Sequence, residues 1–108
     1  MQLVLLSLVL VAMLAGCGSS SSPEPVQATG EVSMAEAKRA YTMKCSLCHG
    51  SDGRLGASQA PDLALSEMSL QERIAIITYG KGVMPPQNDV LDARSIEAVA
   101  RYIENFRE

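Results

Sequence analysis

Residues 45–50 read CSLCHG, and the interpretation of the whole chain depends on this stretch. Cys45 and Cys48 stand three positions apart, and His49, the only histidine of the chain, follows directly. On a helix, side chains at positions i, i+3 and i+4 face the same way. The pattern therefore predicts that two thiols and one imidazole converge on a single partner.

Four kinds of site use closely spaced cysteines. C-x-x-C-H is the attachment signature of c-type haem, in which the sulfurs bind the porphyrin and the histidine binds the iron. A zinc site needs a fourth ligand, and no other Cys or His stands in residues 33–108. A thioredoxin-like dithiol follows a strand, whereas helix signals precede this motif. A disulfide between positions i and i+3 of one helix would be strained. The sequence favours a covalent haem over these three alternatives.

An apolar run, LVLLSLVLVAMLAG, occupies residues 3–16. It is shorter than the ~20 residues that a membrane-spanning helix needs. It matches the apolar region of an export signal, although no Lys or Arg precedes it. The run leads into LAGC, which resembles the lipobox of bacterial lipoproteins and implies cleavage before Cys17 and acylation of that residue. We therefore expect residues 1–16 to be a signal peptide. The alternative is a signal peptide cut nearby, with Cys17 left as an odd thiol.

The next segment has a different composition. Residues 17–32 are rich in Ser, Pro and Gly and show no apolar periodicity, so we expect a lipidated N-terminus followed by a flexible linker. Residues 33–108 then form the folded domain. The chain has one Phe and no Trp, and a domain this small buries little apolar surface. A large flat cofactor would complete such a thin core.

The domain is predicted to be all-α. Ser33 with Glu36, and Ser69 with Glu72, form capping boxes ahead of MAEAKRAYTMK and LQERIAIITY, and Asp92 is placed to cap a third helix. Gly80 ends the second of these helices. The predicted core-facing positions of the three helices are Ala37, Tyr41 and Cys45, then Leu70, Ile74 and Ile77, then Ile96, Val99, Ala100, Ile103 and Phe106.

A haem iron has two axial positions, and His49 would fill one. Met34 and Met43 lie on the helix predicted to lead into His49, and Met68 is expected in the core. Met84 stands in GKGVMPP, between a glycine pair and two prolines. Glycines allow the backbone to approach a ligand closely, and prolines stiffen the loop. We therefore expect Met84 to bind the iron opposite His49; the alternative is a surface loop with an unligated Met.

The motifs CSLCHG, APDL, GKGVMPP and IEAVARYI occur in the order found in the small class I cytochromes c. The chain resembles in particular the membrane-anchored, single-haem cytochromes of Gram-positive bacteria. The resemblance implies a small all-α cytochrome c fold, with three to four helices packed around one covalently bound haem. It also implies that the Pro61 carbonyl accepts a hydrogen bond from His49, and that Leu63 packs on the haem.

The resemblance further implies that the first and last helices cross through Ala37, Tyr41 and Tyr102. The family usually has Gly at the position of Ala37, so this chain departs from the pattern there. Lys44, Lys81 and Arg54 flank the motifs and either surround the exposed haem edge or form solvated surface.

Function follows from the expected coordination. An iron held by both His49 and Met84 has no open position and passes single electrons, and a Met ligand favours a higher potential. The resemblance implies a non-enzymatic carrier, lipid-anchored on the extracytoplasmic face of the cell membrane. Its expected partners are a quinol-cytochrome c reductase and a terminal oxidase, and no nucleic acid is expected. The alternatives are an open-site peroxidase or gas sensor, if Met84 binds weakly, and a fixed electron-entry subunit of a dehydrogenase.

Overall fold

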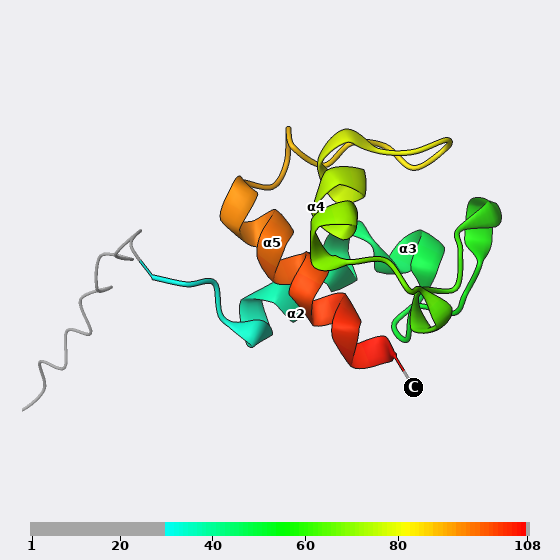
Figure 1. Ribbon diagram of the computed structural model, residues 1–108, viewed down its shortest axis with the longest axis horizontal. Helices are drawn as coiled ribbons and strands as arrows, with labels where there is room; N and C mark the ends of the chain where they lie inside the picture. The colour runs from blue at the N-terminus through cyan, green and yellow to red at the C-terminus, as the bar shows by residue number, and fades with distance from the viewer. Residues whose placement is uncertain (1–29, 108) are drawn as a thin grey trace, which may run out of the picture.

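The computed structural model describes residues 30–107 of the chain, and these residues form a helical domain (Figure 1). The elements are α2 (Met34–Lys44), α3 (Ser46–His49), the 3-10 helices η1 (Ala57–Gln59) and η2 (Leu63–Leu65), α4 (Leu70–Tyr79), α5 (Ala93–Tyr102) and the 3-10 helix η3 (Ile103–Phe106). Within this described part there is no strand, only an isolated bridge between Lys81 and Met84. The all-α prediction is therefore confirmed.

Both predicted capping boxes are formed. The Ser33 side chain accepts a hydrogen bond from the Glu36 backbone N–H, while the Glu36 carboxylate accepts one from the Ser33 N–H at 2.9 Å. Ser69 and Glu72 repeat the arrangement at the start of α4. Asp92 caps α5 by accepting from the Ser95 N–H at 2.8 Å. Each cap satisfies helix-end donors and stabilises its helix by about 1 kcal/mol.

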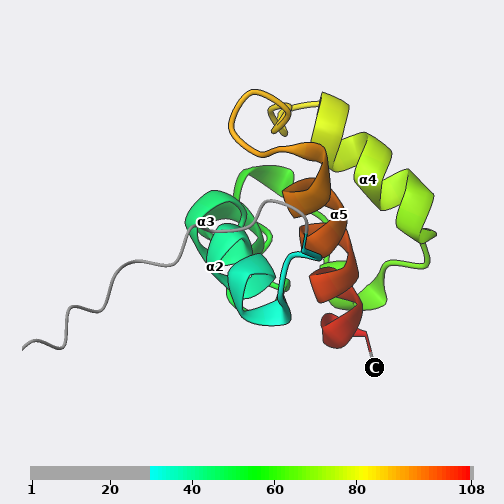
Figure 2. The same ribbon diagram turned by 90° about the vertical axis from the view of Figure 1, so that its left-hand side faces the viewer.

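Helix α5 is the central element, since both α2 and α4 pack against it (Figures 1 and 2). Ala37 on α2 is 1 % exposed, so the alanine in place of the usual glycine is accommodated in the packed interior. The Tyr41 ring packs against Tyr102 in a tilted arrangement and against Phe106 edge-on, with ring centroids 5.4 and 5.1 Å apart. The buried core consists of Tyr41, Cys45, Ile77, Ile96, Val99, Ala100 and Ile103.

Two details differ from the sequence-based expectation. The helix predicted to run into His49 is interrupted, because Cys45 has φ −119° and ψ −35° and separates α2 from α3. Met68, predicted in the core, is half-buried and lies outside the core cluster. Its backbone carbonyl is engaged instead, accepting hydrogen bonds from Arg73 at 2.8 Å and from Arg107 at 2.6 Å.

The predictions for Cys17, the signal peptide and most of the linker fall outside the described residues. Among residues 30–107, none of the helices has the length and apolar character needed to span a membrane.

Candidate haem site

The two cysteines and the histidine of the motif lie on one short helical turn. The Cys45 carbonyl accepts hydrogen bonds from the N–H groups of Cys48 at 3.3 Å and His49 at 3.0 Å. Cys45 and His49 are buried, each 8 % exposed, and Cys48 is half-buried. This turn brings the three predicted site residues together.

The rival interpretations of the motif find no support in the structure. The two thiols are not joined in a disulfide, and helix α2, not a strand, precedes the motif. Burial raises the pKa of the Cys45 thiol to about 11, which disfavours the thiolate form that a dithiol oxidoreductase uses. Across residues 30–107, no group of three or more His, Cys, Asp or Glu side chains is arranged so that it could hold a metal ion by itself.

The imidazole of His49 is suited to bind a metal. Burial lowers its pKa, and the backbone carbonyl of Pro61 has a smaller, opposite effect. The ring is therefore neutral at physiological pH, which is the form that ligates metals. Its Nδ1 is buried and forms no hydrogen bond within normal limits in the described part of the chain. The predicted His49–Pro61 hydrogen bond therefore stays a prediction.

Tyr41 fixes the point where the chain leaves the motif. Its hydroxyl donates a hydrogen bond of 2.7 Å to the Gly50 carbonyl, and burial raises the pKa of Tyr41, so the donor proton is retained at neutral pH. The His49 carbonyl accepts a second bond from the Leu55 N–H at 2.9 Å. These bonds hold the loop that follows the motif close to the motif itself.

Leu63 is tied to the same loop. Its N–H donates to the Gly53 carbonyl at 2.9 Å. A Cβ on Gly53 would lie 2.9 Å from the Leu63 Cβ and 3.0 Å from the Phe106 ring, at a φ of +79°. Only glycine permits this close approach of the two segments. Leu63 also packs against the buried core cluster that contains Cys45, which brings it into the neighbourhood of the motif, whereas Pro61 is exposed.

The loop that carries Met84 lies above α3 in both ribbon views (Figures 1 and 2). Lys81 and Met84 pair through two backbone hydrogen bonds of 3.1 and 3.0 Å, which close a tight turn. Met84 is half-buried and packs against the core cluster, while the neighbouring Val83 is 74 % exposed. The turn therefore directs Met84 inward and Val83 outward.

A protein-family model described as Cytochrome C oxidase, cbb3-type, subunit III matches residues 32–103. The chain belongs to this family of cytochrome c domains. A comparison with curated proteins found no match. The cytochrome c domain implies a covalently bound c-type haem and haem-based electron transfer. When bound, this group supplies one-electron redox chemistry.

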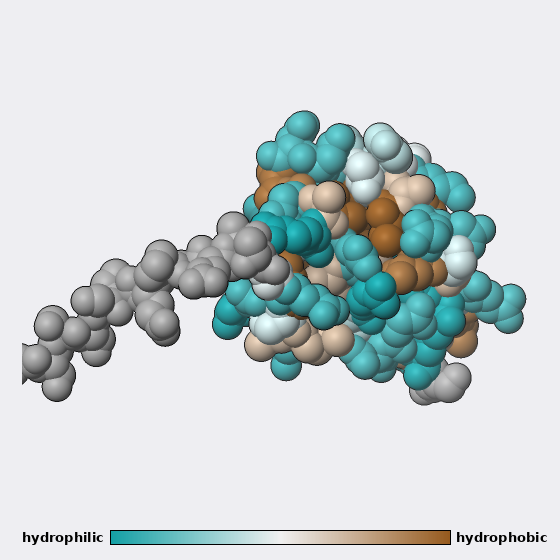
Figure 3. Space-filling view, turned by 60° about the vertical axis from the view of Figure 1, so that its left-hand side comes forward, coloured by the Kyte–Doolittle hydropathy of each residue, from teal (hydrophilic) through white to brown (hydrophobic). Residues whose placement is uncertain are grey.

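The residues of this cytochrome fit such a group. Two free thiols, a buried neutral imidazole and an inward-facing thioether form the donor set that a c-type haem uses. Exposed apolar side chains stand on each segment that carries a predicted site residue: Leu47 (86 % exposed), Leu55 (60 %), Leu65 (69 %) and Val83 (74 %). Exposed apolar side chains beside the motifs are the kind of surface that a large flat apolar cofactor would cover. Figure 3 shows a different face of the domain, on which apolar side chains gather within a polar surround.

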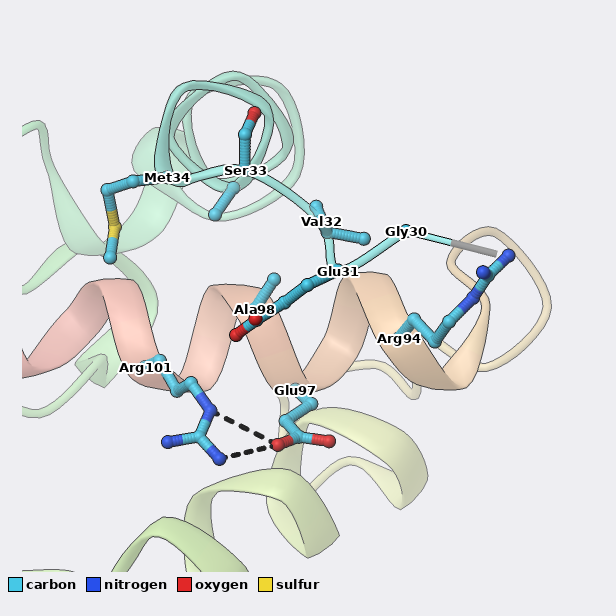
Figure 4. Close-up of a pocket in the computed structure, with 10 residues that line it drawn as sticks. Gly30, Glu31, Val32, Ser33, Met34, Arg94, Glu97, Ala98 and Arg101 are labelled. Carbon is cyan, nitrogen blue, oxygen red and sulfur yellow. Dashed lines mark hydrogen bonds and ion pairs between the residues drawn. The ribbon is translucent and has the colours of Figure 1, made fainter. Parts of the chain in front are cut away.

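A groove between residues 30–34 and α5 lies elsewhere on the cytochrome (Figure 4). It is lined by charged groups, including Glu97 and Arg101, which form an ion pair of 2.7 Å, and Arg94. None of the predicted haem-binding residues lines it. This groove is therefore separate from the haem site.

The sequence did not lead us to predict the burial of two polar residues, Arg73 and Gln87. Arg73, 5 % exposed, donates to the Ala100 carbonyl at 3.2 Å and pairs with Glu104. Arg73 lies on the apolar face of α4, three positions after Leu70, and this position in the sequence could have indicated its burial. Gln87, 8 % exposed, lies in the Met84 loop, and no local pattern indicated its burial.

Proposed function

We propose that this cytochrome carries single electrons through an iron ligated by His49 and Met84, on a haem attached through Cys45 and Cys48. The observation that carries the proposal is the inward placement of Met84. It packs against the same core cluster as Cys45 while Val83 beside it is exposed. A surface loop with an unligated Met would not need this orientation.

The proposed coordination defines the chemistry. With both axial positions occupied by protein, no iron position is open to a substrate, so the protein acts as a carrier and not as an enzyme. A thioether ligand favours the reduced iron and a higher potential. Pro61 and Leu63 complete the proposed pocket, Pro61 by accepting a hydrogen bond from His49 and Leu63 by packing on the haem. A hydrogen bond of this kind orients the imidazole and tunes the iron.

We further propose that the chain is lipid-anchored through Cys17 on the extracytoplasmic face of the cell membrane, as in the Gram-positive lipoprotein cytochromes that it resembles. Electrons would come from a quinol-cytochrome c reductase and pass to a terminal oxidase. The family description, which names an oxidase subunit, supports an oxidase as the acceptor. It also makes a fixed electron-entry subunit of a larger complex the second candidate, which co-purification from mild detergent would reveal.

The substitution Met84→Ala tests the ligation. The haem should stay attached, because both cysteines and His49 are unchanged. The weak far-red absorption band of the oxidised protein, which indicates ligation of the iron by Met, should disappear. The midpoint potential should fall, and the reduced protein should bind carbon monoxide faster. Met68→Ala is the control, since this half-buried side chain lies outside the core cluster. A Met84→Ala protein with an unchanged spectrum and potential would show that Met84 is not the ligand, and the open-site alternative would then replace the carrier.

The substitution Cys17→Ser tests the anchor. The protein should leave the membrane fraction or remain unprocessed, while the haem spectrum stays that of the wild type. The mature wild-type mass should include acyl chains on Cys17. If the wild type is extracted into buffer without detergent, and N-terminal sequencing excludes proteolytic trimming, the result would contradict the lipid anchor.

A further inference from the structure

Gln87 is a buried polar residue in the loop that carries Met84. Its side chain is 8 % exposed, although the neighbouring Pro86 and Asn88 are exposed. A buried side-chain amide is costly unless it forms hydrogen bonds. The Gln87 Nε2 donates one to the Pro85 carbonyl at 3.2 Å.

The backbone of Gln87 connects three segments. Its N–H donates to the Ile77 carbonyl in α4 at 2.9 Å, and its carbonyl accepts from the N–H groups of Val90 and Leu91 at 3.0 and 2.9 Å. Residue 87 is thereby anchored to a helix on one side and to the approach to α5 on the other. The side-chain bond to Pro85 then transmits this anchoring to the peptide next to Met84.

Gly80 packs closely against the same loop. Its Cα faces the Met84 carbonyl, the Pro85 carbonyl carbon and the Pro86 nitrogen, so closely that a Cβ would lie 2.5 to 3.0 Å from them. The Lys81–Met84 pair closes the turn. Because the Met side chain is flexible, a constant sulfur position requires a fixed backbone. The Met84–Pro85 segment is therefore restrained both by close packing against Gly80 and by the hydrogen bond from Gln87.

We propose that Gln87 is a positioning residue for the axial ligand, acting through the Pro85 carbonyl on the backbone of Met84. The inference rests on the proposed ligation of the iron by Met84. In this arrangement the Gln87 amide keeps the loop closed over the haem and limits transient release of the Met84 sulfur. Gln87 contacts neither the iron nor a redox partner in this proposal. Its role is to keep the Met84 sulfur bound to the iron for a larger fraction of the time.

The rate at which carbon monoxide binds the reduced protein reports on this fraction, because the gas must replace Met84. Gln87→Leu keeps approximate size and loses the donor, and Gln87→Ala removes the side-chain amide altogether. We expect both to bind carbon monoxide about tenfold faster than the wild type, the ratio that loss of one buried hydrogen bond produces. The far-red band of the oxidised form should also disappear at a lower temperature in both.

Two controls separate positioning from general stability. Asn88→Ala changes the exposed neighbour in the same loop and should bind at the wild-type rate. Val99→Ala removes packing from a fully buried core position and should lower the unfolding temperature without changing the rate more than twofold. A wild-type rate in either Gln87 variant, or an equal acceleration in Val99→Ala, would overturn the proposal.

A measurement on the wild type applies even if the Gln87 variants fail to fold. The Nε2 protons of Gln87 should exchange with solvent much more slowly than those of the exposed Gln59 and Gln71, and equal exchange would refute the bond. Failure of the underlying ligation has a different signature. It would appear as a wild type without the far-red band, whereas failure of this inference leaves the band present and the Gln87 variants indistinguishable from the wild type.

Discussion

Replacement of Gly80 by alanine should be the most damaging single change in the Met84 loop. Gly80 has φ +75° and ψ 171°, a region occupied almost only by glycine, and an alanine there is strained by about 1–3 kcal/mol. The new Cβ would also lie 2.5 Å from the Met84 carbonyl oxygen and 2.8 Å from the Pro86 nitrogen. Both are backbone atoms, so the loop itself must move. We expect Gly80→Ala to lower the free energy of unfolding by about 3 kcal/mol or more.

Gly82→Ala is the matched control in the same turn. Gly82 also has a positive φ, +58°, but a Cβ there would meet no heavy atom within 4 Å. Its cost should be the left-handed backbone alone, about 1–2 kcal/mol. Urea unfolding of the haem-loaded proteins, followed by circular dichroism, gives both free energies. The far-red band gives the state of Met84, and it should weaken in Gly80→Ala and persist in Gly82→Ala.

The reasoning fails if the two variants are equally stable, because both the backbone contact and the φ/ψ region of Gly80 predict the larger loss at that position. It also fails if Gly80→Ala retains the complete far-red band. That result would mean that displacement of the Met84 carbonyl does not move the sulfur.

Two further predictions concern the tertiary contacts. Tyr41→Phe removes the hydroxyl that donates to Gly50 and should lower the free energy of urea unfolding by about 1 kcal/mol. Tyr102→Phe also removes a hydroxyl and keeps its ring, so an equal loss in that variant would show that the hydrogen bond to Gly50 is not the cause. The Arg73 guanidinium lowers the pKa of Glu104 below 4.5, so this contribution to stability is present above pH 4.5 and is lost as the pH falls through the lowered pKa. Acid unfolding of the wild type should therefore show a larger loss over this range than that of Glu104→Gln, and equal losses would exclude the Arg73–Glu104 pair as the cause.

The features that the sequence determined by itself are local. Ser33 with Glu36, and Ser69 with Glu72, are three positions apart, so their capping hydrogen bonds form as soon as the helix begins, independently of the remaining fold. The C-x-x-C-H spacing likewise places its three groups on one turn. For this reason the starts of α2, α4 and α5, the all-α class and the type of cofactor could be predicted.

The interruption at Cys45 shows where local reasoning ends. Residues 34–49 contain no Gly or Pro, so nothing in the pattern marks a break between α2 and α3. Met68 gives a second example, because its hydrophobic side chain indicated the core, while the fold engages its backbone carbonyl. Neither outcome is encoded within one helical turn.

Only the tertiary structure decided the roles of Arg73, Gln87 and the Tyr41 hydroxyl. Arg73 donates to the carbonyl of Ala100, 27 positions away, and the Tyr41 hydroxyl reaches Gly50 at the end of α3. Gln87 is buried because α4 and the turn before α5 enclose it. A buried polar group must find a partner, but the partner is set by how the helices pack. Hydrogen bonds between neighbours in sequence can be predicted from spacing, whereas those between distant segments follow from the packing of α2 and α4 on α5.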